Sequence, residues 1–399
     1  MFNNLIPTSM QIELNEQQKM IQKMVREFAE KEIAPVAQEL DEKGEYPHKI
    51  LQKMAKLGLL GIFVPKEYGG AGLDIISYAI IIEEISKKCA STGVITSVHN
   101  SLVSYPIMKY GTEEQKKKYL PILAKGEKIG AFAGTEPNAG SDLGAMQTTA
   151  KLKGDKYIIN GDKTFITSGP EAGILIVFAV TDKEKGAKGI SAFIVENKYK
   201  GFKVGGIFDK MGINANLVSE LVFEDMEVPK ENLLGEEGDG FKIALSTLDG
   251  GRIGIASQAV GIAQAALDES IEYSKQRQQF GRPIAKFQAI QWMIAEMATK
   301  IEAARFLVYN AADAKGKGGR FSKEAAMAKL FASETAMDAV IKGVQIHGGY
   351  GYTKEYTIER LFRDAKITEI YEGTSEVQKM VIAGSLLTVS YTHLRAHET

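Results

Sequence analysis

The sequence contains almost no cysteine and little histidine. Cys89 is the single cysteine among 399 residues, and there are five histidines. One cysteine excludes a disulfide bond within the chain, and no group of cysteine and histidine residues has the spacing of zinc ligands. The composition therefore predicts a protein without a structural metal that works in a reducing compartment.

Charge of one sign and long apolar runs are also missing. The chain has 49 basic and 50 acidic residues, so it lacks the basic excess that nucleic-acid binding usually needs. No run of 18 apolar residues occurs, and residues 1–7 lack the basic and apolar segments of a signal peptide. We therefore expect no nucleic-acid partner, no membrane association and a cytoplasmic location.

Several common catalytic motifs are absent too. The chain has no Walker sequence, and no Gly-x-Gly-x-x-Gly lies between an expected strand and an expected helix. It also lacks the Gly-x-Ser-x-Gly elbow of many hydrolases. A nicotinamide-binding Rossmann domain and a serine hydrolase are both disfavoured.

Hydrophobic periodicity divides the chain into three parts. Apolar residues at three- and four-residue spacing predict helices over residues 15–40, 47–57, 75–88, 94–110 and 112–124. Period-two runs replace this pattern from Ile129 to Pro229, with strands at 174–180, 190–195 and 220–223 and a hairpin whose tight turn is Asn160-Gly161. Long helical patterns return over residues 241–277, 286–314, 323–347 and 375–387.

The predicted fold class is α+β. We expect an all-helical domain at residues 1–127, an antiparallel β barrel or sandwich at 128–235 and a four-helix bundle at 236–388. Residues 389–399 continue no periodicity, and we interpret them as a cloning or read-through artefact, the alternative being a native disordered end.

The most informative stretch is Tyr371-Glu372-Gly373-Thr374-Ser375. Ser375 and Gln378 form a capping-box pattern, which predicts that a helix starts at Ser375 and that Glu372 lies in the turn before it. Free backbone N–H groups favour an anion there, and apolar neighbours would raise the pKa of the carboxyl toward that of a useful base. From these residues alone, a solvated glutamate is the simpler alternative.

Two further stretches have the composition of ligand-binding loops. Residues 132–142 combine glycines, which let a backbone approach a flat or anionic ligand, with the hydroxyl groups of Thr135 and Ser141. After the expected hairpin, Phe165 and Thr167 alternate on a strand and would present an aromatic plane and a hydroxyl to one side. A plain connecting loop and a core aromatic are the respective alternatives.

Together these motifs resemble the acyl-CoA dehydrogenases, and the resemblance extends from about Leu14 to Leu387. In that family the glutamate of the Tyr-Glu-Gly-Thr-Ser string is the catalytic base, which implies this role for Glu372. Some members place their base immediately before an arginine that matches Arg252. Because Gly251 occupies that position here, Glu372 remains for the role.

The resemblance also implies an FAD cofactor and the residues that bind it. Near the base, the implied flavin contacts are Phe132, Thr135, Gly140, Ser141, Phe165, Thr167, Thr374 and Glu376. A second group matches residues that reach the FAD of a neighbouring subunit: Arg277, Phe280, Gln288, Gln345, Gly348 and Gly349. For the acyl-CoA substrate, the implied contacts are Ser141, Asp249, Arg252 and Gly373.

The implied reaction is α,β-dehydrogenation of an acyl-CoA thioester, in which Glu372 removes the α-proton and hydride passes to flavin N5. Residues 97–102 and 255–264 look most like the short-chain, butyryl-CoA type. The family further implies an electron-transferring flavoprotein as redox partner, a homotetramer built as a dimer of dimers, and either direction of reaction. Alternatives are a branched or other short substrate, an oxidase or flavin monooxygenase on the same fold, and a non-catalytic acyl-CoA-binding scaffold.

Overall fold

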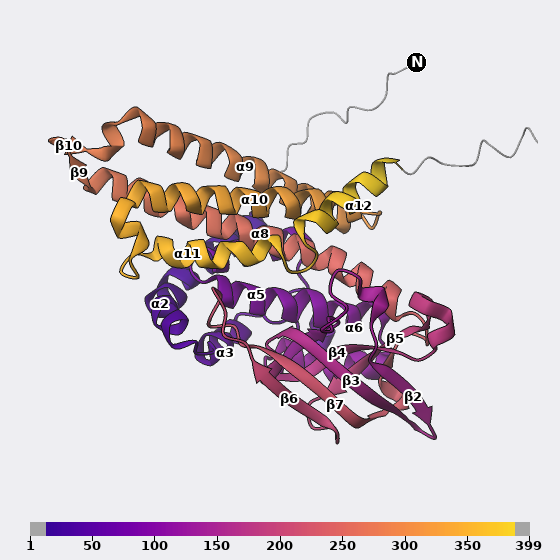
Figure 1. The fold of residues 1–399 in the computed structure, drawn as a ribbon. Coiled ribbons are helices and arrows are strands. Elements are labelled where there is room, and N and C mark those ends of the chain that lie inside the picture. The colour runs from indigo at the N-terminus through magenta and orange to yellow at the C-terminus, as the bar shows by residue number, and fades with distance from the viewer. Residues whose placement is uncertain (1–12, 388–399) are drawn as a thin grey trace, which may run out of the picture.

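The computed structural model describes residues 13–387 and confirms the predicted order of a helical part, a β part and a second helical part (Figure 1). The expectation about residues 389–399 lies outside the described residues. The first part contains α1 (Glu16–Phe28), α2 (Ala34–Lys43), α3 (His48–Lys56), α4 (Ile75–Ser86), α5 (Ala90–Val98), α6 (Tyr105–Tyr110) and α7 (Glu113–Ala124).

Two of the predicted helices are divided by a wider π-helical turn. Residues 29–33 separate α1 from α2, and residues 99–104 separate α5 from α6. Pro35 and Pro106 each lie at the start of the helix that follows. Since proline has no N–H to donate to the preceding turn, the regular hydrogen-bond ladder is interrupted at these points.

The β part is one eight-stranded sheet with the order β6-β7-β3-β2-β4-β5-β8, and β1 pairs with β4. The strands are β1 (Ile129–Ala133), β2 (Thr149–Lys153), β3 (Lys156–Thr167), β4 (Ala172–Val180), β5 (Ile190–Glu196), β6 (Phe202–Ile207), β7 (Val218–Pro229) and β8 (Leu233–Leu234). The sheet is not antiparallel throughout, because β1 and β2 both run parallel to β4. Tyr157 on β3 and Phe193 on β5 have ring centroids 4.9 Å apart although two strands separate them, so the sheet curls around its own core.

The predicted hairpin turn at Asn160-Gly161 is wrong. β3 continues through both residues, and the turn lies earlier, where Lys153 pairs with Lys156. Asn160 and Gly161 form an irregularity in the β3–β7 pairing, in which the Asn160 side chain accepts from the Asp225 N–H at 2.8 Å. Of the pair, only Gly161 has a positive φ, 143°, so these residues form a bulge and do not adopt the backbone angles of a tight hairpin turn.

The last part contains α8 (Gly240–Gln276), α9 (Gln288–Gly316), α10 (Ser322–His347) and α12 (Ser375–Leu387), close to the four predicted helices. A fifth helix, α11 (Thr357–Lys366), was not predicted, and a short ribbon of β9 (Gln278–Gln279) and β10 (Arg282–Pro283) connects α8 to α9. Alanines of α8, α9 and α10 make up much of the central core, so these helices approach closely. Within residues 13–387, no helix is both long and apolar enough to cross a membrane.

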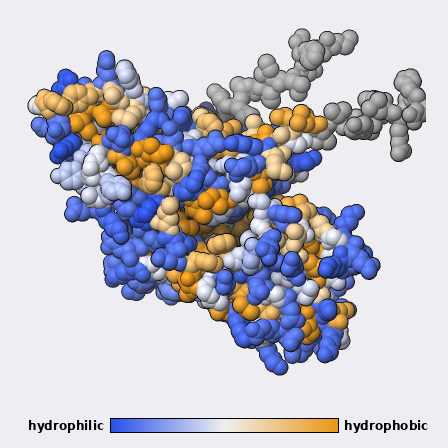
Figure 2. All heavy atoms as spheres, viewed as in Figure 1, coloured by the Kyte–Doolittle hydropathy of each residue, from blue (hydrophilic) through white to orange (hydrophobic). Residues whose placement is uncertain are grey.

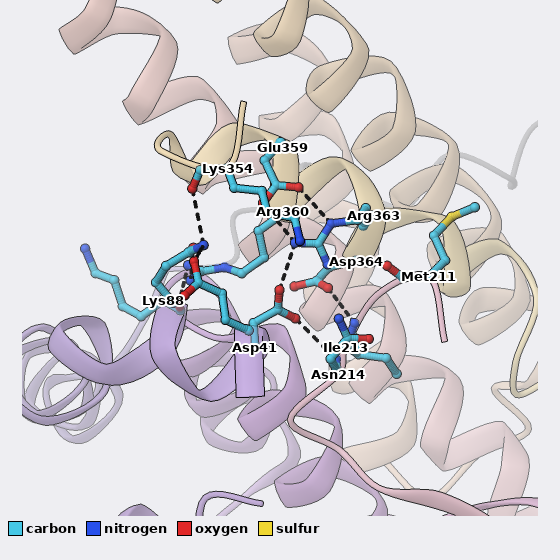
Figure 3. A network of polar contacts seen from close by, with 12 residues as sticks. Asp41, Lys88, Met211, Ile213, Asn214, Lys354, Glu359, Arg360, Arg363 and Asp364 are labelled. Atoms are coloured by element: carbon cyan, nitrogen blue, oxygen red, sulfur yellow. Dashed lines mark hydrogen bonds and ion pairs between the residues drawn. The ribbon is translucent and has the colours of Figure 1, made fainter. Parts of the chain in front are cut away.

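A polar network joins all three parts beside α11 (Figure 3). Arg363 donates to Asp41 of α2 at 2.8 Å, to Glu359 at 2.7 Å and to the carbonyl of Met211 at 3.3 Å. The Ile213 N–H donates to the buried carboxyl of Asp364. These contacts fix the loop between β6 and β7 against the two helical parts.

We predict that Arg363→Met lowers the free energy of unfolding by about 2–4 kcal/mol, because it leaves the buried Asp41 carboxylate without its cation. Thermal and urea denaturation measure the loss. The matched control is Lys366→Met on the same helix, whose ion pair with Glu369 is half exposed and contributes less than about 1 kcal/mol. Equal losses in the two variants would contradict the role given to the network.

Candidate active site

Glu372 lies in a strained turn between α11 and α12. Its φ is 52° and that of Gly373 is 98°, so both residues are in the left-handed region. This conformation suits glycine but costs a glutamate about 1–2 kcal/mol. Strain of this kind persists only where the surrounding structure imposes it.

Side chains from two helices hold the carbonyl groups of this turn. Lys329 Nζ of α10 donates to the Gly373 carbonyl at 2.7 Å. The Gln378 amide of α12 donates to the same carbonyl at 2.8 Å and to that of Glu372 at 3.4 Å. The Tyr371 hydroxyl donates to the Gln258 side chain of α8.

The helix starts at Ser375 as predicted, but the predicted capping box is wrong. The cap is Thr374, whose Oγ1 accepts from the Val377 N–H at 3.3 Å. Ser375 Oγ is buried without a partner in the described chain, and Gln378 turns back to the two carbonyls instead. Thr374 is therefore tied to the helix start, while Glu376 lies exposed in its first turn.

The Glu372 carboxylate is buried and unpaired. Although the residue as a whole is partly exposed, neither carboxylate oxygen is open to solvent or has a hydrogen-bond partner within residues 13–387. Burial raises the pKa of this carboxyl from 4.5 to about 8, against the opposing charges of Lys329 and then Arg252. A carboxyl with these properties can take up a proton near neutral pH.

Glycines on α8 make room for this carboxylate. A Cβ at Gly251 would lie 2.9 Å from Glu372 Cδ and 2.8 Å from Leu102 Cδ2. One turn further on, a Cβ at Gly254 would collide with the hydroxyls of Tyr78 and Ser97, which are 2.8 Å from each other. The glycines of α8 thus leave a narrow surface beside Glu372, lined by Leu102 and by the hydroxyls of Tyr78 and Ser97.

The predicted substrate contacts on α8 lie beside the turn formed by Glu372 and Gly373, which we call the base turn after the role that the sequence predicts for Glu372. Arg252 Nη1 donates to Asp249 at 2.7 Å, and the other carboxylate oxygen of Asp249 accepts from the Ser322 hydroxyl. A Cβ at Gly373 would be 3.8 Å from Arg252 Nη2. Asp249 and Ser322 also line a cavity of about 450 Å³, and Gly144, just after Ser141, faces Phe241 and Ala187 at its edge.

Six of the eight predicted cofactor residues of the first group lie on β1, in the loop after it and on β3, whereas Thr374 and Glu376 lie at the start of α12. The Thr164 N–H donates to the Thr135 carbonyl at 2.9 Å, which joins the loop after β1 to β3. Below this loop, the buried Lys163 donates to the Gly134 carbonyl at 3.2 Å and to Glu136 at 2.8 Å. Phe132 lies partly buried against the Phe178 ring, whereas Gly140 and Ser141 are exposed.

Phe165 lies in a bulge rather than in the regular strand that we expected. The β3–β7 register shifts between Lys163 and Ile166, and the φ of Phe165 is 55°. Its ring is 64% exposed and stacks on Phe208 with centroids 4.7 Å apart. The bulge turns a large aromatic plane outward, while Thr167 on the same strand is partly buried.

The second group of predicted cofactor residues lies at the far end of the bundle. Arg277, Gly348 and Gly349 line a cavity of about 520 Å³ with Tyr273 and His347. Phe280 is 93% exposed at the tip of the β9–β10 ribbon. Gln288 at the start of α9 and Gln345 at the end of α10 are also exposed.

The turn that contains Glu372 and Thr374 lies far from the second group of predicted cofactor residues on the same chain. Lys329, which contacts the base turn, and His347, which lines the second cavity, are 18 residues apart on α10. At a rise of about 1.5 Å per residue, this separation is roughly 27 Å. Viewed as in Figure 1, a hollow with apolar side chains separates the C-terminal helices from the β part (Figure 2).

The sequence did not indicate that Lys329 and Lys163 support the two loops, and it predicted a capping role for Gln378 in place of its contacts with the Glu372 and Gly373 carbonyls. Lys329 carried the clearest signal, because it is a lone charged residue among alanines on a helix that the sequence did predict. A charge in such surroundings is buried and needs a partner.

Family models cover most of the chain. The acyl-CoA dehydrogenase N-terminal, middle and C-terminal domains match residues 15–127, 131–226 and 238–387. With the arrangement of a helical part, a β sheet and a helical bundle, these matches define the class. The chain belongs to the acyl-CoA dehydrogenase family.

Two relatives illustrate the similarity. The short-chain specific acyl-CoA dehydrogenase of Clostridium acetobutylicum is 57% identical over 94% of this chain and 100% of its own length. The caffeyl-CoA reductase–Etf complex subunit CarC of Acetobacterium woodii is 52% identical over 94% of this chain and 99% of its own.

Three solved structures share the fold. Butyryl-CoA dehydrogenase from Megasphaera elsdenii has a TM-score of 0.93 at 50% identity, over 95% of this chain and 100% of that one. A chain solved in work on the electron transferring flavoprotein of Acidaminococcus fermentans has a TM-score of 0.94 at 56% identity, with 95% and 100% coverage. An acyl-CoA dehydrogenase complexed with FAD from Bacillus anthracis has a TM-score of 0.88 at 40% identity, with 94% and 67% coverage.

We predict that Glu372→Gln stabilises the protein in a pH-dependent way. Since the pKa of Glu372 is higher in the folded chain, about 8, than its ordinary 4.5, the wild type loses stability as pH rises from 4.5 through 8. The glutamine variant cannot ionise and escapes this loss. Its melting temperature should equal that of the wild type near pH 4.5 and exceed it by several degrees at pH 9.

Melting curves at matched protein concentration measure this difference, with Glu369→Gln as the control because that side chain lies on the same segment and pairs with Lys366. A melting-temperature difference of the same size at every pH would show that the carboxyl does not titrate as described.

Proposed function

We propose that the protein catalyses FAD-dependent α,β-dehydrogenation of a short-chain acyl-CoA thioester, or the reverse reduction, with Glu372 as the base. The observation that carries this proposal is the buried, unpaired Glu372 carboxylate held in a strained turn against Gly251. The short-chain and butyryl-CoA enzymes among the similar proteins support the substrate class.

The residues present fit a flavin. An exposed aromatic plane at Phe165, an open backbone at Gly140 and the hydroxyl of Thr135 offer a surface for a flat ring system beside the loop after β1. The FAD complex of a structural neighbour supports the identity of the cofactor. Bound FAD would accept the β-hydrogen of the substrate as hydride.

Several groups of the chain have defined tasks in this scheme. Glu372 accepts the α-proton, and its high pKa lets it hold that proton after transfer. The Glu372 N–H forms no hydrogen bond within the described chain, so it is free to donate to the thioester oxygen, where negative charge develops. The side chains of Leu102 and Tyr78 keep water away from the carboxylate.

The substrate would enter from the side of the smaller cavity. We place the CoA portion along Ser141, Asp249 and Arg252, and the acyl end at the glycine-lined surface of α8. Tyr78 and Ser97 leave no space at Gly254, which favours a short acyl chain.

The second group of cofactor residues would serve the FAD of another subunit. Its separation from the base turn of roughly 27 Å supports this arrangement, as does the 93% exposure of Phe280. The single chain exposes several large apolar side chains, among them Trp292, Phe306, Ile341 and Met380. We assign these side chains to the interfaces of a homotetramer. The similarity to a subunit of an Etf complex supports an electron-transferring flavoprotein as redox partner.

Replacing Glu372 tests the function directly. We predict that Glu372→Gln retains FAD and binds butyryl-CoA, but that anaerobic reduction of the flavin slows by at least about three powers of ten, because no group can accept the α-proton. Stopped-flow absorbance measures the rate, and Glu369→Gln is the control on the preceding turn. Rapid bleaching in Glu372→Gln would refute the assignment.

The same measurement gives a pH profile. Since the base must be ionised to act, kcat/KM for butyryl-CoA should rise tenfold per pH unit below about 8 and level off above it. A profile that is flat from pH 6 to 9 would mean that another group removes the proton. Rapid reaction of the reduced flavin with oxygen would indicate an oxidase instead of a dehydrogenase.

A further inference from the structure

We propose that Lys329 is a positioning residue for the base. Its ammonium group holds the Gly373 carbonyl and provides the main positive charge facing the Glu372 carboxylate, which keeps the base aimed and ionised. This inference rests on the proposed function of Glu372 and adds a second residue to the site.

The contact is built into the core of the bundle. Lys329 is completely buried on α10, among the small side chains of Ala325, Ala326, Ala328 and Ala332. Its Nζ lies 2.7 Å from the Gly373 carbonyl, which also accepts from the Gln378 amide at 2.8 Å. One carbonyl oxygen with two donors from different helices is a firmly fixed point.

Stability of the fold does not account for a charge at this position. A buried ammonium group is expensive, and an apolar side chain of similar volume is commonly neutral or stabilising in its place. The hydrogen bond goes to a neutral carbonyl rather than to a carboxylate. Within residues 13–387, no carboxylate therefore forms a direct ion pair with Lys329.

Fixing Gly373 fixes the base. Glu372 and Gly373 both have positive φ, and this strained pair would relax if its carbonyls were released. Relaxation would turn the Glu372 side chain away from Gly251, against which it now packs. Lys329 and Gln378 together prevent that movement.

Of the positive charges near the Glu372 carboxylate, that of Lys329 has the largest effect on its pKa. Lys329 on α10 opposes the rise in the Glu372 pKa more strongly than Arg252 on α8, which is paired with Asp249. Tyr78 on α4 and Tyr371 stay neutral, because burial raises the pKa of both. Burial lowers the pKa of Lys329 itself to about 8, and the negative charge of Glu372 opposes that fall more than the charges of Glu369 and Glu376 do.

Lys329→Met removes the charge and keeps the volume. We expect the midpoint of the pH profile for flavin reduction to rise by at least about one unit, which is about a tenfold loss of rate at pH 7 that disappears at high pH. The control is Lys342→Met on the same helix, whose ammonium pairs with Asp338 and Glu296 and lies 13 residues away. Lys329→Gln, also uncharged, should give the same shift and serves if the methionine variant does not fold.

A second readout does not depend on activity. The infrared carbonyl band of the protonated Glu372 carboxyl, identified by its absence in Glu372→Gln, should disappear at a higher pH in Lys329→Met than in the wild type. An unchanged midpoint in both assays would overturn the inference, even if the rate or flavin content fell, because a purely structural role lowers the plateau without moving the midpoint. If wild-type flavin is not reduced by any acyl-CoA, the proposed function fails, whereas the infrared titration still tests Lys329.

Discussion

The structure depends on one unfavourable arrangement, the burial of a carboxylate that has no hydrogen-bond partner in the described chain. A buried carboxylate in this state is costly, and proteins retain one only where the surroundings enforce it. Here the enforcement comes from the left-handed turn at Glu372 and Gly373, from the donors on α10 and α12, and from the glycine at position 251 of α8. Each of these features helps to hold the Glu372 carboxylate in its buried position.

The rest of the fold brings these features together. Glu372 and Gly251 are 121 positions apart in the sequence, and they meet because alanine-rich faces let α8 and α10 pack closely. The network at Arg363 ties α11, which precedes the base turn, to α2 and to the loop after β6. The sheet contributes the second side of the site, where the Lys163–Glu136 pair supports the loop that contains Thr135.

Much of this arrangement could be predicted from the sequence, because it is recorded in local patterns. Helical periodicity predicted the long helices of both helical parts, and the start of α12 at Ser375 was predicted correctly from a capping-box pattern that does not itself form. The prediction of a hairpin turn at Asn160-Gly161 was wrong because bulges and tight turns both favour glycine. Only the pairing of β3 with β7 shows that these residues form a bulge. The predicted capping residue was wrong for a similar reason. Thr374 and Ser375 are both good N-cap residues, and which of them caps α12 depends on the carbonyl groups to which the Gln378 side chain donates.

The contacts that the sequence could not predict are those between distant segments. Periodicity placed Lys329 on a helix but not toward Gly373, and it gave no sign that Phe165 would leave the regular strand. α11 was missed because its ten residues lie between glycine-rich and turn-forming segments, although Ile358, Leu361 and Ala365 do follow helical spacing.

The most direct test of the account is to follow exchange of the α-hydrogen itself. Butyryl-CoA is incubated anaerobically with the FAD-loaded protein in D₂O, and deuterium at the α-carbon is measured by mass spectrometry. We predict that the wild type incorporates deuterium at the α-carbon and that Glu372→Gln does so at least about a thousandfold more slowly. Equal incorporation by both proteins would contradict the claim that the buried carboxylate is the base.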